Sequence, residues 1–378
     1  MVAPPRTPAT PAPFIESIAS FEAWMAEQLG CLLVTGDLRH KHKRMRRDPF
    51  LFLRGTCWRW AEIAGVEAPE LMEGPAVGSV GDAHVGNFGL WRDAEGRLVW
   101  GVNDFDEAAT IPYRMDLARL VTSARLARRK GDTDGADSTD DRDLAEAALD
   151  GYAAGIADPR PWVLEQDHVW LRDLFAATDH ERVRFWAKLR DAKPAGPVAT
   201  PYRAALERAV ESAAAGATGP IAFSRRRAGV GSLGRPRLVA LADDAGGPIA
   251  REAKALLPSC WDRDAPAGQH YALARGRYRS PDPFLRAEGG IVSRRLAPNS
   301  RKIDIGAHKR RVRRRLIGAM ARDIGAIHAA DARARAAIVE HLAREGHAWL
   351  DRAADAMVEA TRRDWHAFRA ATDHHGTR

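Results

Sequence analysis

Two short polar segments of this chain hold side chains that can act on phosphate groups. Residues 81–89 read GDAHVGNFG, and residues 103–107 read NDFDE. An Asp and an Asn five residues apart in a loop suit phosphoryl transfer, because the Asp accepts the proton of the attacking hydroxyl and the Asn holds Mg²⁺. Asp82 and Asn87 have this spacing. We therefore expect Asp82 and the nearby His84 to be catalytic, and Asn87 to bind metal.

The second segment offers the carboxylates that such a metal site needs. Asp104 is expected to be the main ligand, with Asp106 as the alternative. Oxygen ligands of this kind favour Mg²⁺, also suit Mn²⁺, and suit zinc less well. The alternative interpretation is a polar turn that satisfies its own backbone. Clustered carboxylates repel one another without a cation, which favours the metal site.

The intervening residues indicate how the two polar segments meet. A short strand over 76–80 leads into the first segment, and apolar stretches on both sides of residues 93–96 are typical of a β-hairpin. That hairpin would bring both polar segments to one end. A helix is expected over 113–130, further helical segments over 143–215, a strand over 291–298, and helices again over 307–370.

A glycine-rich stretch later in the chain is a candidate nucleotide-binding loop. Its G-x-G-x-x-G pattern spans 229–234, and Pro236 with an apolar run follows. A dinucleotide fold needs a helix directly after the third glycine, whereas a strand there favours a strand–loop–strand flap over nucleotide phosphates. An ordinary glycine-rich hairpin is the alternative. The residues expected to bind the nucleotide are Gly229, Gly231, Ser232, Gly234 and Lys254.

Lys254 follows the glycines by twenty residues, beyond a turn at Gly246 and Gly247. A lysine on a strand that supports such a flap pairs with the α- and β-phosphates. The surrounding AREAKALLPS is also a good helix former, and a surface lysine is the alternative interpretation. We therefore expect Lys254 to lie on a strand and to contact the nucleotide phosphates.

The bulk composition limits the class of protein. The chain has 378 residues and a formal net charge of +8, enough for one large domain or two of ordinary size. Its arginine excess is typical of compositional bias, with an anionic partner as the alternative. The basic runs 41–47 and 309–315 are expected to be solvated helix faces, so nucleic acid is not an expected partner. The oligomeric state is not indicated.

The cysteines and the apolar pattern predict a cytoplasmic protein. Cys31, Cys57 and Cys260 form no C-x-x-C pair, which argues against a disulfide framework and suits a reducing compartment. The sequence holds no run of roughly 18 apolar residues, so no membrane contact is expected. Residues 1–14 are rich in proline and alanine and are expected to form a disordered tail.

The stretch from GDAHVGNFG to NDFDEA resembles the catalytic region of small-molecule kinases such as the aminoglycoside and choline phosphotransferases. Those proteins carry an H-G-D-x-H-x-x-N loop, a hairpin, and then a metal-binding Asp. Here Val80 stands at the leading histidine, while the matching positions are held by Asp82, His84, Asn87 and Asp104. The linker to Asp104 is a few residues longer than usual.

From about Lys41 onward, the chain resembles the uncharacterised bacterial "domain of unknown function 2252" family. The matching pieces are RMRRDPFLFLRG, GDAHVGNFG, NDFDEA, RMDLARLVTS, AGVGSLG, KALLPS and RRLAP. That family is grouped with protein-kinase-like folds, and the resemblance implies ATP and Mg²⁺ as ligands without naming a substrate. In ordinary kinases the glycine loop and lysine precede the catalytic Asp, but here they follow it. The resemblance thus implies a circularly permuted fold, since termini of compact domains often lie close together.

The expected fold is α+β, a two-lobed protein-kinase-like fold. A mainly helical lobe over 15–217 would carry the catalytic and metal loops, a β-rich nucleotide lobe would cover 218–303, and helices over 304–378 would pack on the helical lobe. The expected function is ATP- and Mg²⁺-dependent phosphoryl transfer to a hydroxyl or amine acceptor. The alternatives are a nucleotidyltransferase on the same scaffold, a nucleotide-binding pseudokinase, and a metal-dependent phosphoester hydrolase with Asp82, His84, Asp104 and Asp106 as ligands.

Overall fold

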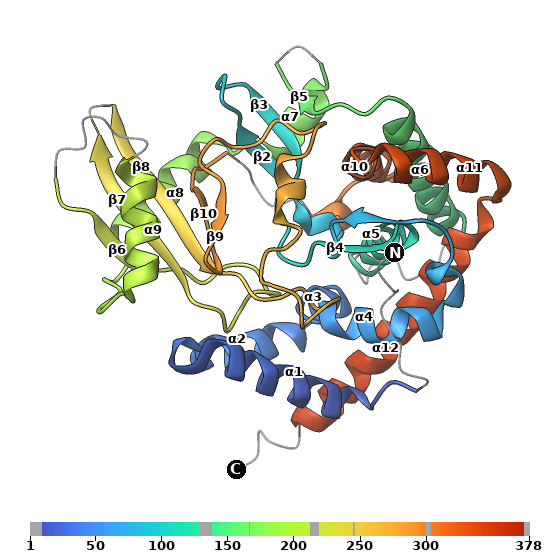
Figure 1. Cartoon of the computed structure of the whole chain (residues 1–378), viewed down its shortest axis with the longest axis horizontal. Coiled ribbons are helices and arrows are strands. Elements are labelled where there is room, and N and C mark those ends of the chain that lie inside the picture. Colours follow the sequence, from blue (N-terminus) through green and yellow to red (C-terminus); the bar gives the residue numbers. More distant parts are fainter. Residues whose placement is uncertain are drawn as a thin grey trace.

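The computed structural model describes residues 10–128, 138–165, 167–211, 219–244, 246–299 and 304–373. The described chain is α+β, with a β-sheet at one side and a packed group of helices at the other (Figure 1). The helices are α1 (Phe14–Leu29), α2 (Thr35–Met45), α3 (Pro49–Gly55), α4 (Cys57–Glu67), α5 (Arg114–Leu126), α6 (Ser138–Ala157), α7 (Val169–Phe175), α8 (Asp179–Arg190), α9 (Thr200–Glu211), α10 (Arg310–His328), α11 (Ala332–Arg344) and α12 (Ala348–Asp373). The strands are β1 (Ala76–Ser79), β2 (Phe88–Arg92), β3 (Leu98–Val102), β4 (Ala109–Pro112), β5 (Trp162–Val163), β6 (Ala222–Arg225), β7 (Arg237–Asp244), β8 (Gly247–Ala255), β9 (Arg286–Glu288) and β10 (Ile291–Arg295).

The larger sheet has five antiparallel strands in the order β6-β7-β8-β10-β9. The glycine-rich residues 229–234 lie in the loop between β6 and β7, so the expected strand–loop–strand arrangement is confirmed. The strand expected around Lys254 is confirmed as well, although its residues are good helix formers. Pairing with β7 on one side and β10 on the other overrides that local preference.

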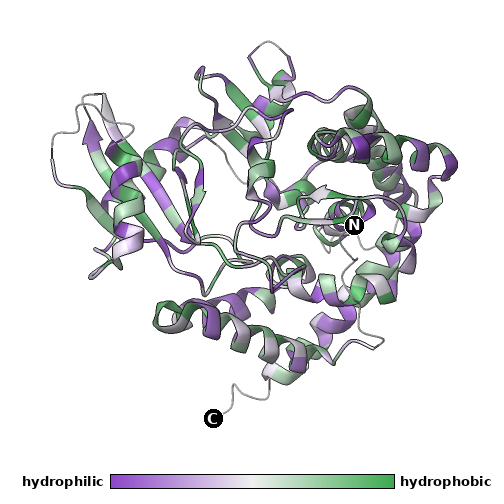
Figure 2. Cartoon of the chain, in the orientation of Figure 1, coloured by the Kyte–Doolittle hydropathy of each residue, from purple (hydrophilic) through white to green (hydrophobic). Residues whose placement is uncertain are grey.

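Apolar and charged side chains alternate along β8, which gives the sheet an apolar face and a polar face. Ala253 and Ala255 pack in the apolar cluster with α9, whereas Glu252 and Lys254 are buried polar residues on the opposite face. Figure 2 accordingly shows hydrophobic and hydrophilic residues mixed along β7 and β8. Because α9 contacts β7, β8 and β10, the packed unit around this sheet begins before residue 218.

A hairpin formed by β2 and β3 brings the two polar segments together, as the sequence predicts. Phe88 pairs with Val102 in the register of these strands, and the backbone N–H of Asn103 donates to the carbonyl of Asn87 at 2.9 Å. The short strand β1 pairs with β4. The first polar segment follows β1 directly, so both segments are anchored by paired strands.

The helices expected over 113–130 and beyond 307 are confirmed, with α5 at the centre of the helical part. Every residue of α5 is buried, and the helix ends at Leu126, earlier than expected. Close packing of α6 on α10 depends on glycine. A Cβ at Gly151 would lie 2.1 Å from the carbonyl oxygen of Gly318, and one at Gly155 would lie 2.2 Å from that of Arg322. These two helices therefore approach backbone to backbone.

The ends of the chain and its basic runs differ in part from the expectations. Residues 1–9 of the expected disordered tail lie outside the described residues, and α1 begins at Phe14. Lys41 begins a basic run that was expected to be a solvated helix face, yet it is buried, because it lies under the aromatic rings of Phe21 and Trp58. Within the described ranges, no helix is both long and apolar enough to cross a membrane.

Candidate functional site

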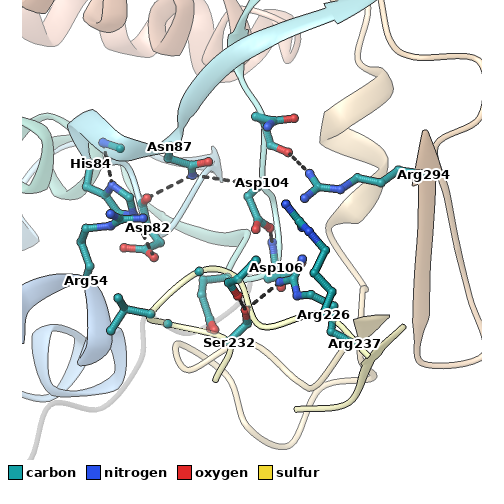
Figure 3. Close-up of a pocket in the computed structure, with 17 residues that line it drawn as sticks. Arg54, Asp82, His84, Asn87, Asp104, Asp106, Arg226, Ser232, Arg237 and Arg294 are labelled. Carbon is teal, nitrogen blue, oxygen red and sulfur yellow. Dashed lines mark hydrogen bonds and ion pairs between the residues drawn. The ribbon is translucent and has the colours of Figure 1, made fainter. Parts of the chain in front are cut away.

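Most of the candidate site residues face a cavity of about 210 Å³ (Figure 3). Three segments that are far apart in the sequence enclose it: the loop after β1, the segment after β3, and the glycine-rich loop of the large sheet. Of the residues expected at the site, the cavity is lined by Asp82, His84, Asn87, Asp104, Asp106, Gly229, Gly231 and Ser232. The structure therefore places the glycine loop opposite the GDAHVGNFG loop, despite their separation in the chain.

Asp82 is held in the cavity by a buried arginine of α5. The Nε of Arg119 donates to Oδ1 of Asp82 at 2.6 Å, and its NH2 donates to the carbonyl of Leu53 at 3.1 Å. The guanidinium also lies over the ring of Trp60, 5.1 Å from its centre. Burial alone would lower the pKa of Arg119, but the Asp82 carboxylate raises it. This pair fixes the orientation of Asp82 and leaves its Oδ2 available.

His84 is a buried, neutral neighbour of Asp82. Its Nδ1 accepts the backbone N–H of Gly86 at 3.0 Å, which caps the short turn Val85–Asn87. Its Nε2 lies 3.7 Å from Oδ2 of Asp82. Burial, together with the positive charges of Arg54 and Arg119, holds the pKa of His84 well below its usual value. The imidazole is therefore uncharged near neutral pH and carries a proton on the nitrogen that faces Asp82.

Asn87 links the GDAHVGNFG loop to the second polar segment. Its amide nitrogen donates to the backbone carbonyl of Asp82 at 3.2 Å and to that of Asp104 at 3.0 Å. Both amide hydrogens are thereby used, and the side-chain oxygen is left free to accept a ligand. Oxygen of this kind suits a hard cation such as Mg²⁺.

Lys254 binds both carboxylates of the second segment. Its Nζ lies 2.9 Å from Oδ2 of Asp104 and 2.7 Å from Oδ1 of Asp106. Burial raises the pKa of a carboxyl group, but the adjacent Lys254 ammonium holds that of Asp104 well below its usual value. For Asp106, burial and the Asp104 charge together raise the pKa to about 6. The two acids therefore share one cation and are not equivalent.

Exposure separates the two carboxylates as metal ligands. The side chain of Asp104 is 36 % exposed, whereas that of Asp106 is 8 % exposed and also lies 3.7 Å from Arg235. Asp104 is thus the more accessible carboxylate for a bound cation. Within the described ranges, no group of three or more His, Cys, Asp or Glu side chains is arranged to hold a metal ion.

A buried network supports the backbone at the start of the GDAHVGNFG loop. Asp116 of α5 accepts the backbone N–H groups of Val80 at 2.7 Å and Gly81 at 2.9 Å. His328 of α10 lies 3.2 Å from the same carboxylate, and Tyr152 of α6 lies 2.9 Å from the other ring nitrogen of His328. A histidine that is distant in the sequence therefore contributes to holding this loop.

A second support from α10 holds the end of β3. Asp323 accepts the backbone N–H of Val102 at 2.7 Å and pairs with Arg279, whose NH2 donates to the Val102 carbonyl at 2.6 Å. Gly101 is needed for this approach because a Cβ there would lie 2.6 Å from Oδ2 of Asp323, and its φ is +156°. One helix therefore positions both polar segments.

The glycines of the loop between β6 and β7 have different roles. Gly229, with φ of +69°, and Gly231 line the cavity. Of the residues expected to bind the nucleotide, Gly234 and Lys254 do not line the cavity. Gly234 has a packing role. Its φ is +102°, and a Cβ there would lie 2.6 Å from Cδ2 of Leu38. This glycine allows the loop to pack on α2, a requirement that the G-x-G-x-x-G pattern does not distinguish from phosphate binding.

Four arginines at the cavity were not assigned to the site from the sequence. Arg226, Arg237 and Arg294 all contact Glu252 of β8, which is fully buried. Arg54 also lines the cavity, and no described residue forms a hydrogen bond or ion pair with its side chain. The alternation of charged residues along β8 was a signal for the first three, because it marks a polar sheet face.

A second cavity of about 360 Å³ adjoins the first. Its apolar lining includes Phe88, Leu90, Val102, Phe105 and Leu296. The lining residues that both cavities share are Arg54, Gly86, Asn103, Arg226 and Arg294. A single ligand with an apolar part and a charged part could therefore occupy both.

Comparison with known proteins gives one finding. Residues 33–218 match the model of a family described as "Uncharacterized protein conserved in bacteria (DUF2252)". The match includes both polar segments and α5 but ends before the glycine-rich loop. Neither the curated proteins nor the solved structures contain a significant match to the chain. Over residues 33–218, the family model therefore supports the resemblance to this uncharacterised bacterial family.

Proposed function

We propose that this protein is an ATP- and Mg²⁺-dependent phosphotransferase with a circularly permuted, two-lobed, protein-kinase-like fold. The acceptor is a hydroxyl or amine. The observation that carries the proposal is the shared cavity, in which Asp82, Asn87 and Asp104 face Gly229 and Gly231. Phosphoryl transfer needs these two groups of residues on opposite sides of one nucleotide.

The sheet supports the same proposal. The glycine loop joins the first two strands of the large sheet along the chain, and Lys254 lies on the third. Protein kinases have a glycine-rich loop over the phosphates and a lysine on the third strand. Here that unit follows the catalytic loop in the chain, which is the order that a circular permutation produces.

The site residues fit Mg²⁺ and nucleotide phosphates. The free side-chain oxygen of Asn87 and the accessible carboxylate of Asp104 would hold the ion, since Mg²⁺ often binds one or two protein side chains together with phosphates. Mg²⁺ in this position supplies neutralisation of phosphate charge. Lys254 would add a second positive charge, and the backbone at Gly229 and Gly231 would approach the phosphates closely.

Asp82 would orient the acceptor and take its proton. The pairing of its Oδ1 with Arg119 leaves Oδ2 for the acceptor, and the neutral His84 supports that side of the carboxylate. A base must lie within hydrogen-bond reach of the proton that it removes. The neighbouring cavity lined by Phe88, Leu90 and Val102 would hold the adenine ring, because such rings bind in largely apolar pockets.

A thermal-shift experiment tests the nucleotide and metal assignments. Mg-ATP at about 100 times its dissociation constant should stabilise the wild-type protein by about 2.7 kcal/mol. The Asp104→Ala variant should lose that stabilisation, whereas Glu95→Ala, an exposed residue at the hairpin turn, should retain it. No shift with Mg-ATP, together with a shift with Mn²⁺ alone, would contradict the proposal and support a metal-dependent hydrolase.

Turnover tests the role of Asp82 and the reaction type. The Asp82→Asn variant should bind Mg-ATP but lose ATP turnover with any acceptor that the wild-type protein uses. ADP is the expected product, whereas AMP with pyrophosphate would show nucleotidyl transfer. Binding of Mg-ATP without turnover across a library of hydroxyl and amine acceptors would support a pseudokinase instead.

A further inference from the structure

Three arginines converge on one buried carboxylate beside the proposed catalytic site. The NH1 of Arg237 lies 2.6 Å from Oε1 of Glu252, and NH2 of Arg294 lies 3.0 Å from the same oxygen. Arg226 contacts Oε2. Glu252 is 0 % exposed and lies on β8, two residues before Lys254. The cluster therefore belongs to the polar face of the sheet that looks into the cavity.

The cluster carries more positive charge than its carboxylate can balance. Burial would raise the pKa of Glu252, but the three surrounding guanidinium groups lower it, so the carboxylate is ionised and supplies one negative charge. The other acids of the cavity are paired elsewhere: Asp82 binds Arg119, Glu107 binds Arg235, and Asp104 and Asp106 share Lys254. Unbalanced charge in a partly buried site is costly unless an anion joins it.

The position of the cluster identifies the part of a ligand that it would meet. Arg226 and Arg294 line both the apolar cavity and the polar cavity. Arg237 lines the polar cavity and donates to Oγ of Ser232 in the glycine loop at 2.7 Å. In Figure 3 the three arginines lie on the other side of Asp104 from Asp82. An anion bound there would sit between an apolar group and the catalytic carboxylate.

We propose that Arg226, Arg237 and Arg294 form a subsite for the diphosphate part of a nucleoside triphosphate. This inference rests on the proposed function and specifies which phosphate reacts. Planar guanidinium groups bind phosphate oxygens in pairs, and two adjacent phosphates match the surplus charge of the cluster. With the α- and β-phosphates held by the arginines, the γ-phosphate extends toward Asp82 and Asp104.

The subsite also defines the leaving group. The acceptor oxygen or nitrogen forms a bond to the γ-phosphorus, and the bond from that phosphorus to the oxygen bridging to the β-phosphate breaks. The bridging oxygen keeps the electron pair on ADP, whose negative charge the arginines stabilise. The acceptor proton passes to Asp82.

Calorimetric titration with ADP, AMP and inorganic pyrophosphate tests this subsite. The Arg226→Gln and Arg294→Gln variants should bind ADP and pyrophosphate at least about tenfold more weakly than the wild-type protein, which corresponds to about 1.4 kcal/mol. AMP affinity should change much less, because AMP lacks the diphosphate. Arg227→Gln is the matched control, since Arg227 is 55 % exposed and pairs with Asp37. Its affinities should equal those of the wild-type protein.

Melting temperatures and an Arg226→Lys variant control for folding. The lysine variant keeps the charge but loses the planar group, so its ADP affinity should lie between those of the wild-type protein and Arg226→Gln. Unchanged ADP affinity in both glutamine variants would overturn the subsite while leaving the proposed function in place. An equal loss for AMP would overturn it as well, because the arginines would then contact only the nucleoside monophosphate.

The subsite and the proposed function can fail separately. Arginine-dependent pyrophosphate binding by a protein that binds no nucleotide would support an anion subsite and contradict the ATP assignment. Release of pyrophosphate during turnover would place the α-phosphate, not the γ-phosphate, at Asp82 and overturn the proposed orientation. Failure of the wild-type protein to bind ADP and pyrophosphate would refute both.

Discussion

Replacement of Lys41 by methionine should stabilise the protein and weaken nucleotide binding. Lys41 is 1 % exposed on α2, with its Nζ 5.6 Å from the centre of the Phe21 ring and 5.0 Å from that of Trp58. Its hydrogen-bond acceptor is the Gly231 carbonyl at 3.4 Å, and no described carboxylate pairs with it. Burial lowers its pKa from 10.5 to about 8.

The pKa difference sets the size and direction of the stability change. A folded-state pKa below the unfolded value means that the fold disfavours the charged lysine, so the penalty is full below about pH 8 and disappears above 10.5. A difference of about 2.5 pKa units corresponds to about 3 kcal/mol. Lost cation–π contacts with two rings, about 1 kcal/mol each, offset part of the gain. We expect Lys41→Met to be about 1 kcal/mol more stable at pH 7.

Urea denaturation at two pH values measures this effect. The stability difference between Lys41→Met and the wild-type protein should shift by about 2 kcal/mol in favour of the wild type between pH 7 and pH 9.5, because the wild-type lysine loses its charge in the fold. Lys43→Met, on the exposed side of the same helix, should show little pH-dependent difference. A Lys41→Met variant that is less stable than the wild-type protein at pH 7, with a stability difference that does not change with pH, would refute the reasoning.

The cost of burying Lys41 is explained if the residue positions the glycine loop. Its contact with the Gly231 carbonyl is the one hydrogen bond that the lysine makes among the described residues. Loss of this contact should weaken Mg-ATP binding several-fold in Lys41→Met but not in Lys43→Met. Equal ATP affinity for all three proteins would show that Lys41 does not support the loop.

Further substitutions test other supports of the site. Arg119→Met should destabilise the fold by about 3 kcal/mol in urea denaturation, because it leaves the Asp82 carboxylate without its buried partner; a loss below about 1 kcal/mol would contradict this pairing. In Lys254→Met the two carboxylates of the NDFDE segment lose their shared cation. Mg²⁺ without nucleotide should therefore raise the melting temperature of this variant more than that of the wild-type protein. An equal rise in both proteins would count against a metal site at these carboxylates. Gly101→Ala should destabilise the protein by about 2 kcal/mol and weaken Mg-ATP binding, since the added Cβ meets Asp323. Wild-type values in both assays would show that the close contact between Asp323 and the backbone at residue 101 is not required.

Local signals in the sequence predicted the arrangement of the polar segments. The turn at 93–96 between apolar stretches implied the hairpin of β2 and β3, and the hairpin necessarily places Asn87 beside Asn103. The glycine loop between two strands was predictable for a similar reason, since Pro236 and the following apolar run favour a strand there. Patterns among residues that are close in the sequence were therefore sufficient to predict the hairpin and the glycine loop.

Contacts between distant residues could not be predicted in this way. Asp82 pairs with Arg119, and Asp116 with His328, only because α5 packs beside the GDAHVGNFG loop and α10 packs on α5. Glu252 draws its three arginines from different parts of the sheet, and many other arginines in the chain have the same local pattern. The role of Gly234 was also hidden, because packing against Leu38 and phosphate binding both require glycine.

A crystal structure with Mg²⁺ and a non-hydrolysable ATP analogue tests the central claim most directly. The claim is that the catalytic loop and the glycine loop form one nucleotide site despite their reversed order in the chain. We predict that the phosphates lie between Gly229–Ser232 and Asp104, with the metal on Asn87 and Asp104 and the base in the apolar cavity. A nucleotide bound away from Asp82, or a metal held without Asp104, would contradict the account.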